Sequence, residues 1–282
     1  MKYLITGATG DVGSKVVELL IRSGERAKVF VRDAQKARLR FGDCVDVFVG
    51  DLANPESLRV ALKGIDELFL VNTGPQIPVR DEAAATAAKA AGVKHVVKLS
   101  SMDVQHGLAI GAWHERGESA VRASGVPYTF VQPTGFTSNL LAWAPSIKAE
   151  GLVRASTGEG GRAFIHSDDI AAVVVKALTT RAYDERSLPI TGPEALTFAE
   201  VTARIGTAIG KPLTFQPISD EEARRRYSDI SGSEEETEAH VSLWRAIREG
   251  RLATVTDNVE RILGRKPIAL HQWLTENAPA FQ

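Results

Sequence analysis

The feature that most constrains the fold is a run of closely spaced glycines that begins at residue 7. The segment Thr6-Gly7-Ala8-Thr9-Gly10-Asp11-Val12-Gly13 directly follows a short apolar run over residues 3–5 and precedes a helical pattern over residues 14–23. Glycine permits a tight turn and lets backbone N–H groups approach a pyrophosphate, and a helix N-terminus adds partial positive charge. Gly13 is expected to let the helix pack closely on the sheet. The pattern predicts a dinucleotide site, and the alternative is a purely structural turn.

The first 130 residues repeat this alternation of short apolar runs and helical patterns. Strands separated by helices at such spacing imply right-handed βαβ units and a parallel sheet. The predicted fold class is α/β, a Rossmann-type doubly wound parallel sheet with a smaller C-terminal substrate-binding lobe. The further strands are predicted over residues 28–31, 45–49, 67–71, 95–99 and 128–131, and an alanine-rich helix over residues 83–91.

The pattern loosens after residue 135. A helix over residues 168–179 and a run over residues 188–190 are expected to return to the sheet, while the remaining C-terminal segments look helical, with Pro212, Pro217 and Pro267 as breaks. We expect the ligand in the cleft between the two parts. The predicted parts are an NADP(H)-binding core over residues 1–135 plus 163–191 and a substrate lobe over residues 136–162 plus 192–282.

Residues 219–251 are dense in charge. A solvated helical face with a loop around Ser231-Gly232-Ser233 is the favoured interpretation, and a mobile lid is the alternative.

The end of the second predicted strand indicates which dinucleotide is bound. Sites that prefer NAD usually place an acidic residue there, where it accepts hydrogen bonds from ribose hydroxyls. Here the strand ends in Val31-Arg32-Asp33, and Lys36 follows one turn later. Arg32 can bind a 2′-phosphate through two parallel hydrogen bonds, whereas Asp33 is expected to pair with Lys36 or to cap the next helix. NADP(H) is therefore predicted over NAD(H), and the alternative is that Arg32 is a surface charge.

Composition excludes several classes of function. The 34 Lys and Arg residues nearly balance the 35 Asp and Glu residues, so no strong positive field favours nucleic acid. Cys44 is the single cysteine, which excludes an internal disulfide or a thiolate-rich metal site. No apolar run approaches the roughly 20 residues that span a bilayer. A cytoplasmic protein with no nucleic-acid partner, no membrane partner and no metal is expected.

Taken together, these segments resemble the NmrA-like, atypical branch of the short-chain dehydrogenase/reductase superfamily, and above all its quinone reductase and triphenylmethane reductase type. The resemblance covers essentially the whole chain. Two positions depart from the family pattern, since Gln132-Pro133 replaces a common Arg-Pro and His166 replaces a common acidic residue. The matching segments are residues 6–13, 31–33, 50–52, 91–97, Trp113-His114 with Glu118, 124–130, Phe136, Asn139 and Asp169-Ile170-Ala171.

The usual proton donor of the wider superfamily, a Tyr with a Lys four residues later, is missing. Residues Gly7, Gln132, Ser187 and Ser231 stand four positions after the four tyrosines. The resemblance instead places His114 and Glu118 in the corresponding helix, on one face at i,i+4 spacing. Glu118 is expected to hold His114 in one tautomer and to raise its pKa, so that His114 donates a proton or orients the substrate. The alternative is a structural pair, or a surface pair with Arg122.

Hydroxyl and apolar groups complete the expected site. Ser100 and Ser101 follow the fifth strand, from which this superfamily points a hydroxyl at the substrate, and Ser101 joins His114 and Glu118 as a candidate catalytic residue. The alternative is a strand-ending turn whose hydroxyls bond to the backbone. Asp51 is expected to bind the adenine amino group or to form a turn. The candidate substrate residues are Met102, Trp113, Phe136, Asn139 and Trp143, and for any single apolar residue ordinary core packing is the favoured interpretation. The candidate cofactor residues are Gly7, Thr9, Gly10, Asp11, Val12, Gly13, Arg32, Lys36, Asp51, Leu52, Asn72, Thr73, Gly74, Ser100, Gln132 and Pro133.

The sequence thus predicts an NAD(P)H-dependent reductase that transfers hydride to a quinone-like or other conjugated, apolar small molecule. Such acceptors need less acid assistance than plain carbonyls, which is compatible with the missing Tyr and Lys. Two alternatives stay open, a non-catalytic NADP(H)-sensing regulatory protein and a pathway-specific biosynthetic reductase or isomerase. A homodimer is a further possibility.

Overall fold

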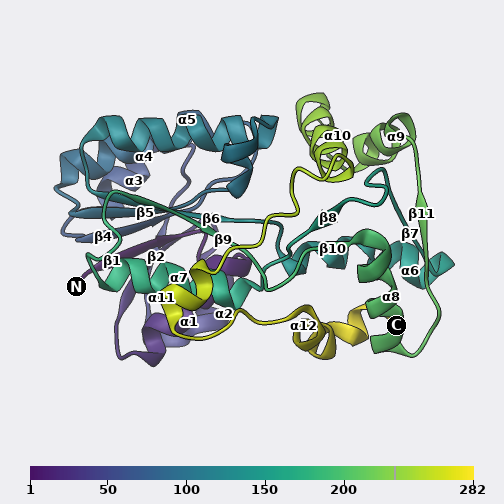
Figure 1. Ribbon diagram of the computed structural model, residues 1–282. Coiled ribbons are helices and arrows are strands. Elements are labelled where there is room, and N and C mark those ends of the chain that lie inside the picture. The colour runs from purple at the N-terminus through teal and green to yellow at the C-terminus, as the bar shows by residue number, and fades with distance from the viewer. Residues whose placement is uncertain (232) are drawn as a thin grey trace. The chain divides into compact units, whose positions relative to one another are not determined.

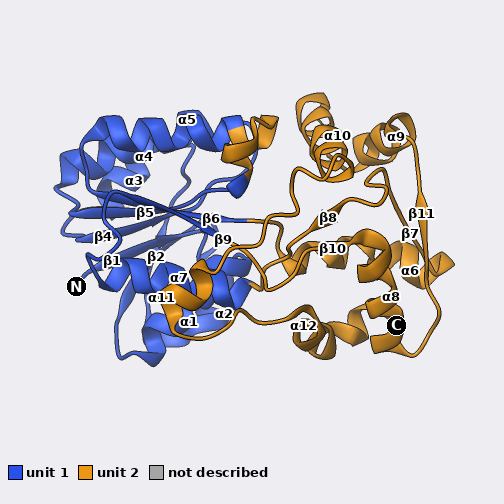
Figure 2. Ribbon diagram, in the orientation of Figure 1, with its two compact units in different colours: residues 1–102, 112–133, 167–189 blue, residues 103–111, 134–166, 190–282 orange. Residues whose placement is uncertain are grey.

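The computed structural model describes residues 1–231 and 233–282, and the chain divides into two compact units (Figure 2). Each unit is assembled from three separate stretches of chain. Unit 1 contains residues 1–102, 112–133 and 167–189, and unit 2 contains residues 103–111, 134–166 and 190–282. The assignment of the two parts to cofactor and substrate binding stays a prediction.

Unit 1 is built on a seven-stranded sheet with the order β3-β2-β1-β4-β5-β6-β9. The pairings of β1 with β2 and β4, of β2 with β3, and of β5 with β4 and β6 are all parallel. The strand order reverses between β1 and β4, which is where sheets of this kind bind ligands at their carboxyl edge. The predicted Rossmann-type α/β fold is confirmed. The strands are β1 (Tyr3–Thr6), β2 (Ala27–Val31), β3 (Asp46–Val49), β4 (Glu67–Leu70), β5 (His95–Leu99), β6 (Tyr128–Pro133) and β9 (Arg186–Ile190).

Helices cover both faces of this sheet (Figure 1). α1 (Asp11–Arg22), α2 (Ala34–Phe41) and α7 (Ser167–Thr179) lie on one face, and α3 (Pro55–Ala61), α4 (Ile77–Ala91) and α5 (Ala109–Ser124) lie on the other. Alternate side chains of each strand point to opposite faces of the sheet. Because helices cover both faces, the side chains on both are mostly apolar. The core under α3, α4 and α5 includes Leu4, Phe30, Leu58, Leu68, Ala84, Val96, Val121 and Phe130. Short 3-10 turns occur over Gly42–Cys44 and Met102–His106.

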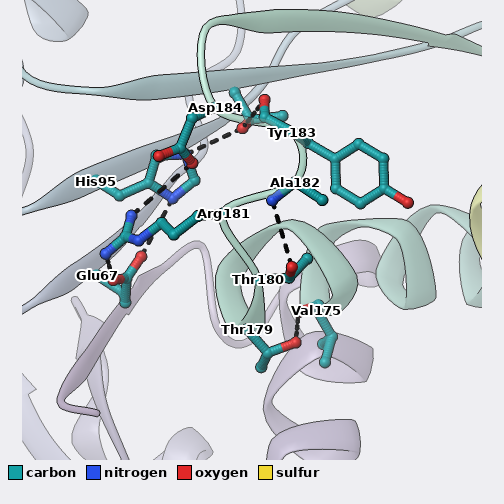
Figure 3. A network of polar contacts seen from close by, with 10 residues as sticks. Glu67, His95, Val175, Thr179, Thr180, Arg181, Ala182, Tyr183 and Asp184 are labelled. Atoms are coloured by element: carbon teal, nitrogen blue, oxygen red, sulfur yellow. Dashed lines mark hydrogen bonds and ion pairs between the residues drawn. The ribbon is translucent and has the colours of Figure 1, made fainter.

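A polar network closes the amino-terminal edge of the same sheet (Figure 3). Glu67 begins β4, is buried, and accepts a hydrogen bond from Arg181 Nη2 at 2.5 Å. His95 begins β5 and lies between Glu67 Oε2, 3.2 Å from Nδ1, and Thr129 Oγ1, 3.0 Å from Nε2. Thr129 in turn donates to the carbonyl of Tyr183 at 2.7 Å. These bonds fasten the connection between α7 and β9 to the sheet.

Unit 2 has its own apolar core, formed mainly by helices. Its buried side chains include Leu140, Ile147, Phe198, Leu243 and Trp273. The helices are η3 (Thr137–Trp143), α6 (Ala144–Glu150), α8 (Phe198–Ile209), α9 (Asp220–Ser231), α10 (Glu234–Arg248), α11 (Asn258–Leu263), α12 (Leu270–Asn277) and η4 (Ala278–Phe281).

Two short sheets in unit 2 correct the prediction that the C-terminal segments are only helical. β8 (Gly161–Arg162) pairs antiparallel with β10 (Leu196–Thr197), and β7 (Leu152–Ala155) pairs parallel with β11 (Thr214–Pro217). Pro217, expected as a break, is the last residue of β11. A proline is tolerated there because an edge strand leaves some N–H groups unpaired.

The charged segment 219–251 forms α9 and α10, as its helical interpretation predicted. Asp220 accepts hydrogen bonds from Arg245 and Arg248, and the Arg248 guanidinium holds the pKa of this carboxyl below its usual range. Gly232, in the predicted loop, lies outside the described residues. The lid alternative stays a hypothesis.

Removal of the Glu67 carboxylate is expected to destabilise the fold. Glu67→Ala leaves His95 and Arg181 without a buried acceptor, so the free energy of unfolding should fall by about 1–3 kcal/mol in urea denaturation. Glu56→Ala is the matched control, because Glu56 pairs with Arg59 on the exposed face of α3. That change should cost less than about 1 kcal/mol. An equal small loss in both variants would contradict the anchoring role of Glu67.

Candidate functional site

The glycine turn after β1 has the geometry that its sequence predicted. Gly7 has a φ of +60°, a conformation that favours glycine, and the N–H of Gly10 donates to its carbonyl at 2.9 Å. A Cβ on Gly13 would lie 2.1 Å from the Gly7 oxygen. The expected role of Gly13 therefore needs correction, because its missing side chain makes room for the turn itself rather than for the sheet. Of the neighbouring residues, Thr9 is half-buried, and Val12 is buried at the start of α1.

The turn is locked to the end of the neighbouring strand β4. Thr6 Oγ1 donates to the carbonyl of Phe69 at 3.0 Å and accepts from the N–H of Val71 at 2.8 Å. A Cβ on Gly7 would lie 3.1 Å from Val71 Cβ, so the two connections are in close contact. The carboxyl ends of β1 and β4 are thus held together at the reversal of the strand order.

The start of α1 is supported by α7. Asp11 accepts a hydrogen bond from Ser167 Oγ at 2.6 Å, and Lys15 pairs with Asp168 at 2.5 Å. The Asp11 side chain, a predicted cofactor contact, therefore has a structural partner within unit 1.

The end of β2 resolves the two expectations for Asp33. Its carboxylate accepts the N–H groups of Gln35 and Lys36, so it caps α2 rather than pairing with the Lys36 ammonium. Arg32 and Lys36 have exposed side chains next to this cap.

The residues expected after β3 and β4 lie at the same carboxyl edge. Asp51 is exposed and accepts the N–H of Ala53 at 2.9 Å, so the turn interpretation holds, while its contact with adenine stays a prediction. Leu52 is half-buried. Asn72 is buried and donates to Asp81 Oδ1 at 2.6 Å, whereas Thr73 next to it is exposed. Gly74 has a φ of +77° in the following turn.

His114 and Glu118 do not form the predicted pair, because the Glu118 carboxylate is engaged by other side chains. Glu118 is buried, and its Oε1 accepts hydrogen bonds from Ser100 Oγ at 2.5 Å and from Gln132 Nε2 at 2.7 Å. Its Oε2 accepts from Arg122 Nη2 at 3.0 Å, so the alternative of an arginine pair applies to Glu118. Glu118 therefore bonds to Ser100 and Gln132, which follow or end β5 and β6, and not to His114 four residues earlier on the same helix.

The expected rise of the His114 pKa is also wrong. Burial lowers the pKa of His114 well below its usual value, and the positive charge of Lys98 lowers it further. Lys98 Nζ lies 3.5 Å from His114 Nδ1. Lys98 is not among the predicted site residues, although a lysine inside the apolar run His95-Val96-Val97-Lys98-Leu99 is a signal for one.

The remaining candidates fall in different units. Met102, Trp113, Ser101 and Pro133 are buried in unit 1. In unit 2, Phe136 forms a backbone bridge with Ile165, Trp143 packs on Phe198 with ring centroids 5.1 Å apart, and Asn139 is exposed. The half-buried indole of Trp143 therefore packs against the core of its unit, and substrate contact stays a prediction for all of these residues.

Two further observations concern residues 1–231 and 233–282. They contain no group of three or more His, Cys, Asp or Glu side chains arranged to hold a metal ion. None of their helices is both long enough and apolar enough to cross a membrane.

Comparison with known proteins identifies the family. A family described as NAD(P)H-binding matches residues 7–181. A (4-alkanoyl-5-oxo-2,5-dihydrofuran-3-yl)methyl phosphate reductase of Streptomyces griseus is 38% identical over 281 residues, which cover 99% of this chain and 98% of the relative. An NAD(P)H azoreductase of Xenophilus azovorans is 36% identical over 283 residues, with coverage of 99% and 98%.

Solved structures agree on the fold. The NADPH-dependent quinone oxidoreductase QOR2 of Escherichia coli, complexed with NADPH, aligns with a TM-score of 0.87 at 23% identity over 98% of this chain and 99% of that one. The glycine turn at the reversal of the strand order and the relatives that match over nearly their full length lead to one conclusion. The chain belongs to the NAD(P)H-binding family, is an NAD(P)H-dependent reductase and has NmrA-like oxidoreductases among its relatives.

Proposed function

We propose that this reductase prefers NADPH and passes its hydride to a quinone or to another conjugated, apolar acceptor. The observation that carries the cofactor preference is the exposed guanidinium of Arg32 beside a capping Asp33. An acidic side chain at this place would favour the ribose hydroxyls of NAD, but the Asp33 carboxylate is engaged by two backbone N–H groups of α2. Arg32, with Lys36 one turn on, suits a 2′-phosphate.

The turn after β1 fits the pyrophosphate of such a cofactor. Gly10 caps α1 without a side-chain hydrogen bond, in contrast to Asp33 on α2 and Asn54 on α3. The first N–H groups of α1 therefore face no capping side chain, and a phosphate oxygen is the partner they suit. Gly7 and Gly13 keep the backbone bare around this point.

The acceptor class follows from the chemistry that the chain lacks. Bound NAD(P)H supplies a hydride with its electron pair, and one proton must reach the reduced acceptor as well. The chain has no Tyr with a Lys four residues later to deliver that proton. An electrophilic acceptor such as a quinone takes the hydride first, and its oxygen can then take a proton from water. The activities named for an azoreductase and a quinone oxidoreductase support this choice.

A second candidate is a pathway-specific reductase whose acceptor carries a phosphate. The relative with 38% identity is named for a methyl phosphate with a dihydrofuran ring that bears oxo and alkanoyl groups. The ring carbon–carbon double bond in that name is conjugated with carbonyls, so both candidates share an electron-poor π system as hydride acceptor.

The substitution Arg32→Ala is expected to weaken the binding of NADPH more than the binding of NADH. Loss of charged hydrogen bonds to the 2′-phosphate should raise the Kd of NADPH about 10- to 100-fold, which corresponds to about 1.5–3 kcal/mol. The Kd of NADH should change less than about threefold. Fluorescence titration of both cofactors measures this, with Arg38→Ala on the exposed face of α2 as the control. An equal change for both cofactors would contradict a phosphate contact.

A panel of acceptors is expected to separate the candidate functions. We expect NADPH oxidation with tetramethyl-1,4-benzoquinone, which lacks ring hydrogens and so resists addition of the exposed Cys44 thiol. A plain ketone should give no turnover. An acyl butenolide with and without a methyl phosphate tests the second candidate. Turnover only with the phosphate ester would favour that candidate, and tight NADPH binding without turnover on any acceptor would favour a sensor.

A further inference from the structure

An ion pair without exposed surface lies inside unit 1. Lys98 Nζ of β5 is 2.7 Å from Asp81 Oδ2 of α4, and both side chains have a relative exposure of 0%. Lysine and aspartate are almost never fully buried unless they are paired, and the loss of hydration makes such a pair a poor source of stability. The pair therefore points to a role other than stability.

The Asp81 carboxylate is held from several sides. Asn72, two residues after the end of β4, donates to Oδ1 at 2.6 Å. A Cβ on Gly117 of α5 would lie 2.2 Å from Oδ2, so α5 has a glycine where the carboxylate of α4 approaches it. The Lys98 ammonium is held in place in turn, because it is paired with the fixed Asp81 carboxylate.

The same ammonium faces His114. Lys98 Nζ is 3.5 Å from His114 Nδ1 and 3.4 Å from the carbonyl oxygen of Leu99. An ammonium has donors only, so Nδ1 must present its lone pair to it. The imidazole hydrogen of the neutral ring then resides on Nε2, on the side of the ring away from this contact.

None of the other charged groups on α4 and α5 offers His114 a carboxylate that would favour the imidazolium. On α5 itself, the Glu118 carboxylate is engaged by Ser100, Gln132 and Arg122, while Glu115 and Arg116 are exposed. On α4, Asp81 contacts the lysine and not the imidazole. Lys98 is thus the charge that His114 meets, and together with burial it lowers the pKa of the imidazole.

We propose that Lys98, seated on Asp81, is a positioning residue that fixes His114 as a neutral imidazole with Nε2–H as the hydrogen-bond donor to the acceptor. This inference rests on the proposed function for the identity of the acceptor. His114 then orients an acceptor oxygen and stabilises the negative charge that develops there, and water supplies the proton. Asn72 links the same network to the connection after β4, where the nicotinamide ribose is expected.

The pH dependence has a definite sign. The folded state disfavours the imidazolium, so the unfolded chain binds this proton more readily than the folded one. The contribution of His114 to stability is therefore complete above its ordinary pKa of 6.5 and is lost as the pH falls below that value. Within the folded protein, His114 stays neutral through the physiological range.

The first test is the tautomer of His114 in the wild-type protein. Two-bond ¹H–¹⁵N correlation spectra of ¹⁵N-histidine-labelled protein are recorded from about pH 5.5 to about pH 8, with and without NADP⁺. The His114 signals are assigned by their absence in His114→Gln. We expect the neutral Nε2–H pattern without titration. A neutral Nδ1–H pattern, or protonation near the ordinary histidine pKa, would overturn the proposal.

A paired substitution tests the role of Lys98. Lys98→Met combined with Asp81→Asn removes both charges and so leaves no uncompensated ion. We expect mixed His114 tautomers and protonation at a higher pH than in the wild type. Lys94→Met, which removes an exposed lysine paired with Asp66 near the start of β5, should leave the His114 signals unchanged. An unaltered tautomer in the double variant would refute the positioning role, and if this variant does not fold, the wild-type spectra still decide.

The contact with the acceptor is tested in a complex that cannot react. NADP⁺ and tetramethyl-1,4-benzoquinone are both oxidised, so no hydride is available. Binding of the quinone should shift the Nε2–H resonance of His114, and a bound quinone without that shift would exclude the donor role. A protein that reduces no quinone but keeps the Nε2–H tautomer would contradict the proposed acceptor while leaving the effect of Lys98 on His114 intact.

Discussion

An ammonium and a carboxylate buried together place more constraints on this structure than any apolar contact does. Each ion, taken out of water alone, would cost several kcal/mol, so both must be surrounded by suitable partners. Asn72 occupies one carboxylate oxygen, and the bare backbone at Gly117 admits the other. β5, α4, α5 and the connection after β4 are therefore held in one arrangement, and the imidazole of His114 is oriented by it.

Buried polar contacts have different roles at the two edges of the central sheet. At the amino edge, Glu67, His95 and Arg181 fasten the connection to β9 and involve none of the residues expected to contact the cofactor. At the carboxyl edge, the bonds of Glu118 to Ser100 and Gln132 join the ends of β5 and β6 to α5. Under the proposed function, the fixed polar groups at the carboxyl edge would give the hydride acceptor a preorganised environment, in which fixed dipoles stabilise charge better than mobile water does.

Local patterns predicted much of unit 1. The turn at Gly7 and the short apolar strands depend on neighbours in the sequence, so they can be recognised from it. The partners of buried polar groups depend on the tertiary fold. The i,i+4 spacing of His114 and Glu118 permitted a pair, but Ser100 and Gln132 reach the carboxylate from two strands. The apolar run around Lys98 marks the lysine as unusual, but its partner Asp81 lies on another element, so the sequence alone does not identify the pair.

The β7–β11 pairing was missed for a related reason. β11 contains only four residues, ends in Pro217 and has mostly exposed or half-buried side chains, so alternation of apolar residues is weak there. Its partner is more than 50 positions earlier in the chain. Short edge strands of this kind are defined by their neighbours rather than by their own sequence.

The contacts of α7 with α1 have a consequence for synthesis on the ribosome. The N-terminal helix α1, which follows the glycine turn, is braced by Ser167 and Asp168, which are made more than 150 residues later. A nascent chain that already contains β1 to β6 therefore still lacks the helix that packs beside α1. The glycine turn and α1 are made first, but α1 gains its packing partner only when α7 has been synthesised. Until then the growing chain exposes the apolar surface that α7 covers, and such surface favours aggregation and chaperone binding.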